Sequence, residues 1–201
     1  MNKHLLLILL GTALANPASY ATATPAAESP SAVTQKKSAG KLADNPFSSA
    51  SKLPYHYPAF DQIKNTHYAP AFTEGMRQHA AEITLIANNR AAPTFENTVV
   101  AMERAGQMLN RVSIVFFSLT GANTNPVLEA LSRDLAPKLA AHQDQIFLNA
   151  RLFQRISKLY EARQALKLDA ESERLLERYY TDFVRAGARL GDKDKQKLKG
   201  L

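Results

Sequence analysis

The chain has 201 residues, 45% of them hydrophobic, which is enough for one sizeable folded domain. It contains no cysteine, so disulfide frameworks, thiol catalysis and thiolate metal sites are excluded. The net charge of +7 comes largely from lysines in a linker and near the C-terminus. Aspartates interrupt the C-terminal lysines and no aromatic residue accompanies them, so nucleic-acid binding is not expected.

The first 23 residues have the pattern of a secretory signal peptide. Lys3 precedes an apolar run from Leu5 to Leu14, and small residues follow up to Ala23. This run is shorter than the roughly 20 apolar residues that span a bilayer. We therefore expect export to the periplasm and no membrane association after cleavage, with an uncleaved anchor as the alternative. Residues 24–44 are rich in Ala, Ser, Pro and Lys and are expected to form a disordered linker.

Segment 45–66 is predicted to be a loop-rich lead-in, because its prolines hold the backbone extended and prevent a long helix. Large apolar side chains are frequent in it, namely Phe47, Leu53, Tyr55, Tyr57 and Phe60. We expect them to pack on the helices behind, since aromatic rings dominate burial in cores. The alternative is an aromatic lip that faces a substrate.

Two helices are predicted next. The first covers residues 70–88, with Pro70 in its first turn and apolar residues at three- and four-residue intervals. The second covers about residues 94–120 and passes through Gly106, which we interpret as the place of a close helix crossing. Residues 112–119 are apolar nearly all round, so this part is expected to be buried among several neighbours.

The third predicted helix begins at the cap and proline pair Asn125-Pro126 and extends to about Tyr160. Pro137 lies inside it and predicts a kink, because proline removes one backbone hydrogen bond and clashes with the preceding turn. An interruption around Asn149–Ala150 is the alternative to one continuous helix.

The fourth helix is predicted to begin at Asp169, an N-cap, and to end at Gly191 in the left-handed conformation. Asp192 then predicts the cap of a fifth helix, and the chain ends inside that pattern, which leads us to expect truncation at the C-terminus. No strand alternation or hairpin signal occurs. The predicted class is all-α, with antiparallel helical segments.

No catalytic, cofactor-binding or metal-ligating residue is expected in this chain. None of its five histidines begins an H-E-x-x-H motif, in which two histidines one turn apart hold zinc. His79 and Glu82 are interpreted as a surface pair, His142 as a core or boundary residue, and His67 as a packing residue. Carboxylates within residues 171–177 are interpreted as ion pairs with neighbouring arginines.

Four segments, in order, resemble one known family. They are NPF at residues 45–47, LPYHYPAFDQIKNTHYAPAFTEGM, TFENTVVAMERAGQMLNRVSIVFFSLTGANTN and LDAESERLLERYYTDFVRAGARL. The stretch from residue 45 to residue 201 resembles the N-terminal helical region of the thimet oligopeptidase family of zinc peptidases, and within it the peptidyl-dipeptidase (Dcp) branch.

This resemblance implies the N-terminal helical domain of a zinc-dependent peptidase that releases C-terminal dipeptides from oligopeptides. The domain would form a wall of the substrate channel. Zinc is implied for the longer family member and not for this chain, which is expected to be inactive alone. Its implied partners are oligopeptide substrates and the remainder of the peptidase chain. The alternative is an independent periplasmic helical module that binds peptides or a protein partner without catalysis, motivated by the apolar turns 112–119.

Overall fold

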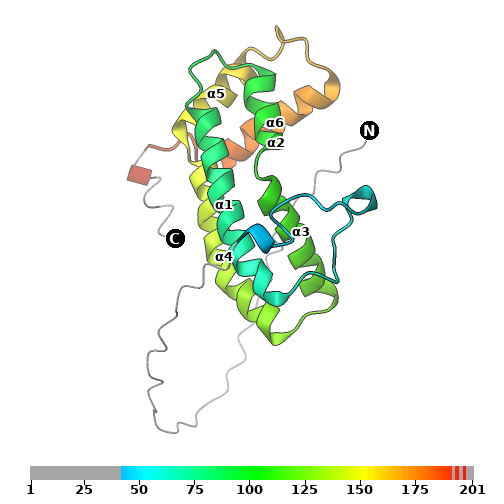
Figure 1. Cartoon of the computed structure of the whole chain (residues 1–201). Coiled ribbons are helices and arrows are strands. Elements are labelled where there is room, and N and C mark those ends of the chain that lie inside the picture. Colours follow the sequence, from blue (N-terminus) through cyan, green and yellow to red (C-terminus); the bar gives the residue numbers. More distant parts are fainter. Residues whose placement is uncertain (1–41, 192, 195–196, 198–201) are drawn as a thin grey trace. The chain divides into compact units, whose positions relative to one another are not determined.

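The computed structural model describes residues 42–191, 193–194 and 197 (Figure 1). The predicted signal peptide, nearly all of the predicted linker and most of the predicted fifth helix lie outside these described residues. The last three linker residues, Leu42–Asp44, form a 3-10 turn.

All regular structure in the described residues is helical, which confirms the predicted all-α class. The longer helices are α1 (Asn65–Ala87), α3 (Gln107–Ala122), α4 (Pro126–Phe147), α5 (Ala150–Glu161) and α6 (Ala170–Arg185). A π-helical turn (Glu96–Val100) leads into the short α2 (Ala101–Arg104), and Pro54–His56 is a 3-10 turn. None of these helices combines the length and the apolarity that crossing a lipid bilayer requires.

Three helices begin at side-chain caps, and two of these caps, Asn125 and Asp169, are predicted by the sequence. Asn125 Oδ1 accepts hydrogen bonds from the backbone N–H groups of Val127 and Leu128, and Asn149 Oδ1 accepts one from Leu152. Asp169 caps α6 in the same way. Such caps satisfy N–H groups that have no partner inside the helix. The interruption at Asn149–Ala150 is therefore real, and it separates α4 from α5.

Prolines fit into two helices without ending them. α1 begins at Asn65, five residues before the predicted start, so Pro70 lies in its second turn. At this helix start, the backbone N–H of Lys64 donates to Nδ1 of His67, which corrects the purely packing role expected for that histidine. α4 continues through Pro137 as one helix.

The predicted second helix is divided, which corrects the expectation of one continuous helix over residues 94–120. Between α2 and α3, Ala105 is extended (ψ 160°) and Gly106 is left-handed (φ 70°). Glycine adopts this region without the steric penalty of a Cβ. A Cβ at Gly106 would lie 2.9 Å from Cγ of His79, so the predicted close approach at this glycine is present although the helix is broken.

The end of α6 also differs from the prediction. The helix ends at Arg185, and Gly187, not Gly191, takes the left-handed conformation (φ 91°). The backbone N–H of Ala188 donates to the carbonyl of Phe183 over 2.9 Å, as expected for a left-handed helix end.

The buried core has two parts. The first, called here the α1–α3 core, comprises Phe47, Tyr68, Ala71, Phe72, Met108, Val112, Val115, Phe116, Leu128 and Leu135. The second, called the α5–α6 core, comprises Ile83, Ala87, Val99, Met102, Ile146, Leu152, Ile156, Leu159, Leu176, Phe183 and Ala188. α1 runs through both parts, with α3 alongside one half of it and α5 and α6 at the other end (Figure 1). The closest crossing is at Gly75, where a Cβ would lie 2.9 Å from the Leu109 backbone.

Candidate functional site

The lead-in segment, called here the strap (residues 45–62), is fixed at its start. Phe47 is buried, and its ring lies 5.4 Å from that of Tyr68. Asn45 Nδ2 donates to the carbonyl of His67, and the guanidinium of Arg111 donates to the carbonyl of Phe47. These hydrogen bonds attach the first residues of the strap to α1 and α3.

Further along the strap, the large apolar side chains are exposed, which corrects the expectation that they pack on the helices. Tyr55 is 100% exposed, and Leu53, Tyr57 and Phe60 are exposed as well. Tyr55 and His56 also have positive φ values of 56° and 57°. Side chains with a Cβ adopt this conformation at a cost, and such strain is frequent at functional sites. The strap is therefore a candidate interaction surface.

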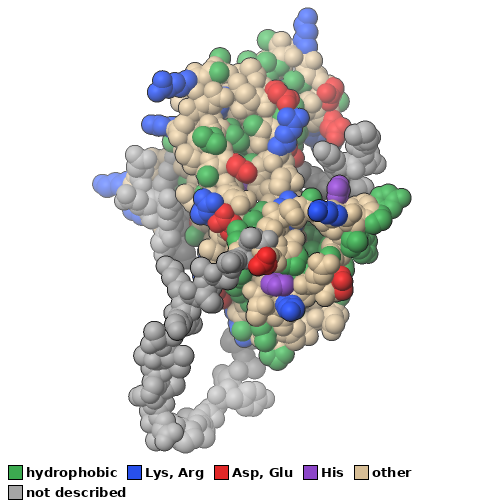
Figure 2. All heavy atoms as spheres, viewed as in Figure 1, with side chains coloured by type: hydrophobic (Ala, Val, Ile, Leu, Met, Phe, Trp, Pro, Cys, Tyr) green, Lys and Arg blue, Asp and Glu red, His purple; other side chains and the backbone are tan. Residues whose placement is uncertain are grey.

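α3 is only partly covered, which qualifies the prediction for residues 112–119. Val112, Val115 and Phe116 are buried, but Ile114 and Phe117 are exposed. In the space-filling view, hydrophobic side chains gather at the edge where the strap projects (Figure 2). Exposed apolar groups near one another are typical of surfaces that contact a partner.

His79 and Glu82 do not form the surface pair that the sequence suggested. His79 is half-buried, and its Nδ1 lies 3.0 Å from Nε2 of His142, a residue 63 positions away. Glu82 instead accepts the backbone N–H of Gly106 over 2.6 Å. Burial, and then the proximity of His142, lower the pKa of His79 to about 4, and burial lowers the pKa of His142. Both imidazoles are thus neutral at pH 7, and His142 is a boundary residue as predicted.

The donor set in the described residues does not fit zinc. No group of three or more His, Asp or Glu side chains lies in a position to hold a metal ion within that part of the chain. The histidine pair supplies two ring nitrogens, whereas a protein zinc site uses at least three ligands. Glu82, three residues after His79, is already engaged with the backbone of Gly106.

Arg155 on α5 is the centre of a buried polar network. Its side chain is 6% exposed and donates to the carbonyls of Asn89 and Ala91 over 2.8 and 3.0 Å. It also donates to Oγ1 of Thr98 and to Oδ1 of Asn97. Asn97 in turn exchanges hydrogen bonds with Thr94 at the start of the π-helical turn. One guanidinium therefore joins α5 to the loop after α1 and to the next helical turn.

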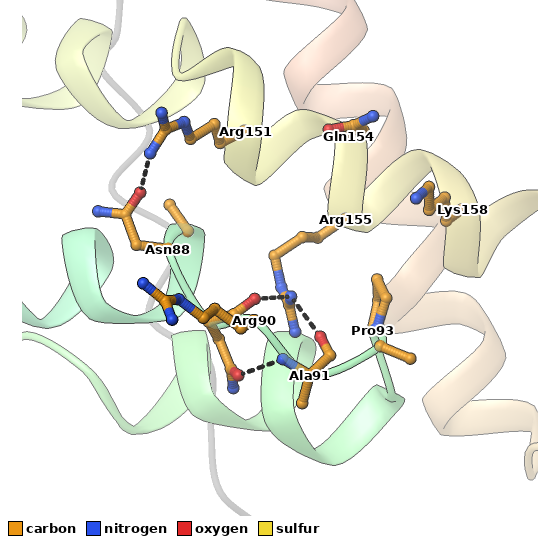
Figure 3. Close-up of a pocket in the computed structure, with 11 residues that line it drawn as sticks. Asn88, Arg90, Ala91, Pro93, Arg151, Gln154, Arg155 and Lys158 are labelled. Carbon is orange, nitrogen blue, oxygen red and sulfur yellow. Dashed lines mark hydrogen bonds between the residues drawn. The ribbon is translucent and has the colours of Figure 1, made fainter.

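A depression of about 360 Å³ lies beside this network. α5 lines one side with Arg151, Gln154, Arg155 and Lys158, and the loop over residues 88–93 lines the other (Figure 3). Arg90 contributes a fourth cationic side chain from the loop, and Arg151 donates to Oδ1 of Asn88. No acidic residue is among those that line the depression.

Sequence reasoning missed this cationic site, although one signal for it exists. Arg155 falls between Leu152 and Leu159 on the buried stripe of α5, and a charged residue on an apolar stripe indicates a buried partner. The partner carbonyls belong to a loop more than 60 residues away, and no local pattern reveals that contact.

Comparison with known proteins gives two curated relatives. The chain is 48% identical over 157 residues to a dipeptidyl carboxypeptidase of Escherichia coli (strain K12), covering 78% of this chain and 23% of that protein. It is 46% identical over 160 residues to a dipeptidyl carboxypeptidase of Salmonella typhimurium, covering 80% and 24% respectively. The chain thus spans about a quarter of the length of these relatives. No family model matches it.

Proposed function

Because this chain is homologous to the dipeptidyl carboxypeptidases over most of its length, we propose that residues 45–201 form the N-terminal helical domain of a peptidyl-dipeptidase. The complete enzyme would release C-terminal dipeptides from oligopeptides. The single observation that carries this proposal is an identity of 48% over 157 residues, which is 78% of this chain.

In this proposal, the domain contributes one wall of the substrate channel. The exposed strap residues and the uncovered face of α3 support it, because apolar side chains of this size need cover from a partner or a substrate. The rest of the peptidase chain would supply most of that cover, with oligopeptides as the second partner.

Zinc chemistry would come from outside the described residues. Their side chains do not fit a zinc site, so no catalytic step is assigned to them. The expected consequence is that this chain has no peptidase activity alone. We also propose a periplasmic location, on the basis of the signal-peptide pattern in residues 1–23.

A second candidate function is a helical module that binds a peptide or a protein without catalysis. Tyr55 is the observation that favours it, because a fully exposed tyrosine in a strained backbone conformation is also what a surface for binding a peptide or protein would present. The first function predicts that the native protein hydrolyses peptides, whereas the second predicts that it only binds them.

An antibody against residues 45–190 separates them. The native protein is captured from the periplasmic fraction and assayed for dipeptide release from an oligopeptide, with and without a zinc chelator. We expect chelator-sensitive activity from the captured protein, and none from the purified 201-residue chain with added zinc. A captured protein of this chain's length, without activity, would favour the binding module.

A further inference from the structure

The depression between α5 and the loop over residues 88–93 concentrates positive charge. Arg90, Arg151, Arg155 and Lys158 all line it, and among the described residues none of these four forms a salt bridge with a carboxylate. Like charges gathered in a concave site raise the local positive potential and attract anions. Surface cations in helical proteins are more often interspersed with acidic residues.

Within the part of the chain that the structure describes, no carboxylate pairs with Arg155. Burial of a charged group is unfavourable unless it is paired and hydrogen-bonded. All four of its hydrogen bonds go to neutral acceptors, namely two carbonyls, a hydroxyl and an amide oxygen. A guanidinium has five N–H donors, so one N–H of Nη2 is left over from these four bonds. An anion in the depression would supply both the charge and the fifth acceptor.

We propose that this depression binds a peptide carboxylate, held by Arg90, Arg151 and Lys158 beside the remaining N–H of Arg155. The planar fork of a guanidinium matches the two oxygens of a carboxylate. The site therefore selects a free C-terminus or an acidic side chain, which have the same chemistry. The anion site follows from the charges alone, whereas the choice of a peptide as its source rests on the proposed function.

The test is an NMR titration of the purified 201-residue chain with short peptides. The probes are N-acetyl-Ala-Ala with a free C-terminus, the same peptide as its amide, N-acetyl-Ala-Asp-Ala-amide and inorganic phosphate. We expect the two peptides with a carboxylate to shift the backbone amides of residues 88–92, with dissociation constants on the order of 1 mM. The fully amidated Ala-Ala peptide should bind at least about tenfold more weakly. The carboxylate peptide that binds more tightly shows whether the site prefers a free C-terminus or an acidic side chain.

Two variants assign the binding to this site. Arg90→Gln with Lys158→Gln removes two charges but no hydrogen bond recorded in the structure, and it should weaken binding by about tenfold. Arg174→Gln is the matched control, because Arg174 is an exposed cation of α6 that does not line the depression. It should change binding by less than about twofold. Circular dichroism confirms that each variant is folded.

Three results would overturn the inference. They are no shifts from either carboxylate peptide, equal shifts from the amidated Ala-Ala peptide, and tighter binding of inorganic phosphate than of any peptide. The titration does not depend on catalysis, so its failure would leave the proposed peptidase function intact.

Discussion

The two parts of the core differ in how completely the described residues cover them. In the α5–α6 core, amphipathic helices turn one apolar stripe inward, and Arg155 closes the loop that borders it. In the α1–α3 core, α3 is apolar on most sides, and the strap buries Phe47 but leaves Tyr55, Tyr57 and Phe60 exposed. Near the α5–α6 core, exposed apolar residues also occur, at Leu85 and Leu190, but singly. The contrast is between an end of the domain that covers its own apolar side chains and an end that leaves several of them exposed.

The largest effect should come from the network that closes the α5–α6 end. Replacement Arg155→Met would remove four hydrogen bonds from a charged donor, including those to the carbonyls of Asn89 and Ala91, and a hydrogen bond to a charged group contributes about 1 kcal/mol or more. We expect the free energy of unfolding to fall by about 3–5 kcal/mol in urea denaturation, because all four bonds are lost together. Arg174→Met, on the exposed surface of α6, should change it by less than about 0.5 kcal/mol. Similar losses of stability for both variants would show that the Arg155 network does not stabilise the α5–α6 end.

The α1–α3 crossing is tested by two glycines. In Gly75→Ala, the new Cβ would meet the Leu109 backbone at 2.9 Å, so the two helices must move apart. We expect a loss of about 2–3 kcal/mol. Gly121→Ala in α3 is the matched control, since nothing lies within 4 Å of its Cβ, and it should be neutral or slightly stabilising. A neutral Gly75→Ala would show that the crossing is looser than described.

Acid should destabilise the fold through the histidine pair. The pKa of His79 is lowered to about 4 from its usual 6.5, mainly by burial, so the unfolded chain binds the proton more readily than the folded one. The contribution of neutral His79 to the free energy of unfolding is therefore fully present above about pH 6.5. It is lost as the pH falls toward 4, which lowers the free energy of unfolding by about 1–3 kcal/mol. Glu82 acts in the opposite direction and limits the loss.

Thermal melting of the parent and of His79→Gln across pH 4–7 measures this contribution. The melting temperature of His79→Gln should depend less on pH than that of the parent, because the variant has no imidazole to take up a proton at that position. Parallel curves for the parent and His79→Gln would contradict the assignment.

The smallest effect is expected where the strap is exposed. Tyr55→Ser and Phe60→Ser should change the free energy of unfolding by less than about 0.5 kcal/mol, because neither ring is buried. Phe47→Ala, in the same strap, removes a buried ring and should cost about 3 kcal/mol or more. Chemical denaturation of the three variants measures this difference. A large loss for Tyr55→Ser would mean that the strap is part of the core.

Local signals account for what the sequence predicted well. The sequence predicts the caps at Asn125 and Asp169 correctly, because a cap is decided by the residues that directly follow it. The break at Gly106 was missed because the apolar stripe continues on both sides of it. The apolar pattern of the fourth predicted helix continues to Leu190, so the sequence predicts the left-handed end at Gly191 instead of at Gly187.

Contacts between distant segments account for the rest. The composition of the strap is the same whether its rings are buried or exposed, so Phe47 and Phe60 could not be told apart. The contacts of His79 with His142, and of Arg155 with the loop after α1, join residues more than 60 positions apart and exist only in the folded chain.

The most direct test of the central claim is a chimera. In the Escherichia coli dipeptidyl carboxypeptidase, the region that aligns with this chain is replaced by the corresponding residues of this chain, and peptidase activity is measured. If this domain is the helical region of such a peptidase, the chimera should retain activity within about tenfold of the parent enzyme. A folded chimera without peptidase activity would contradict the proposal and leave the binding module as the better account.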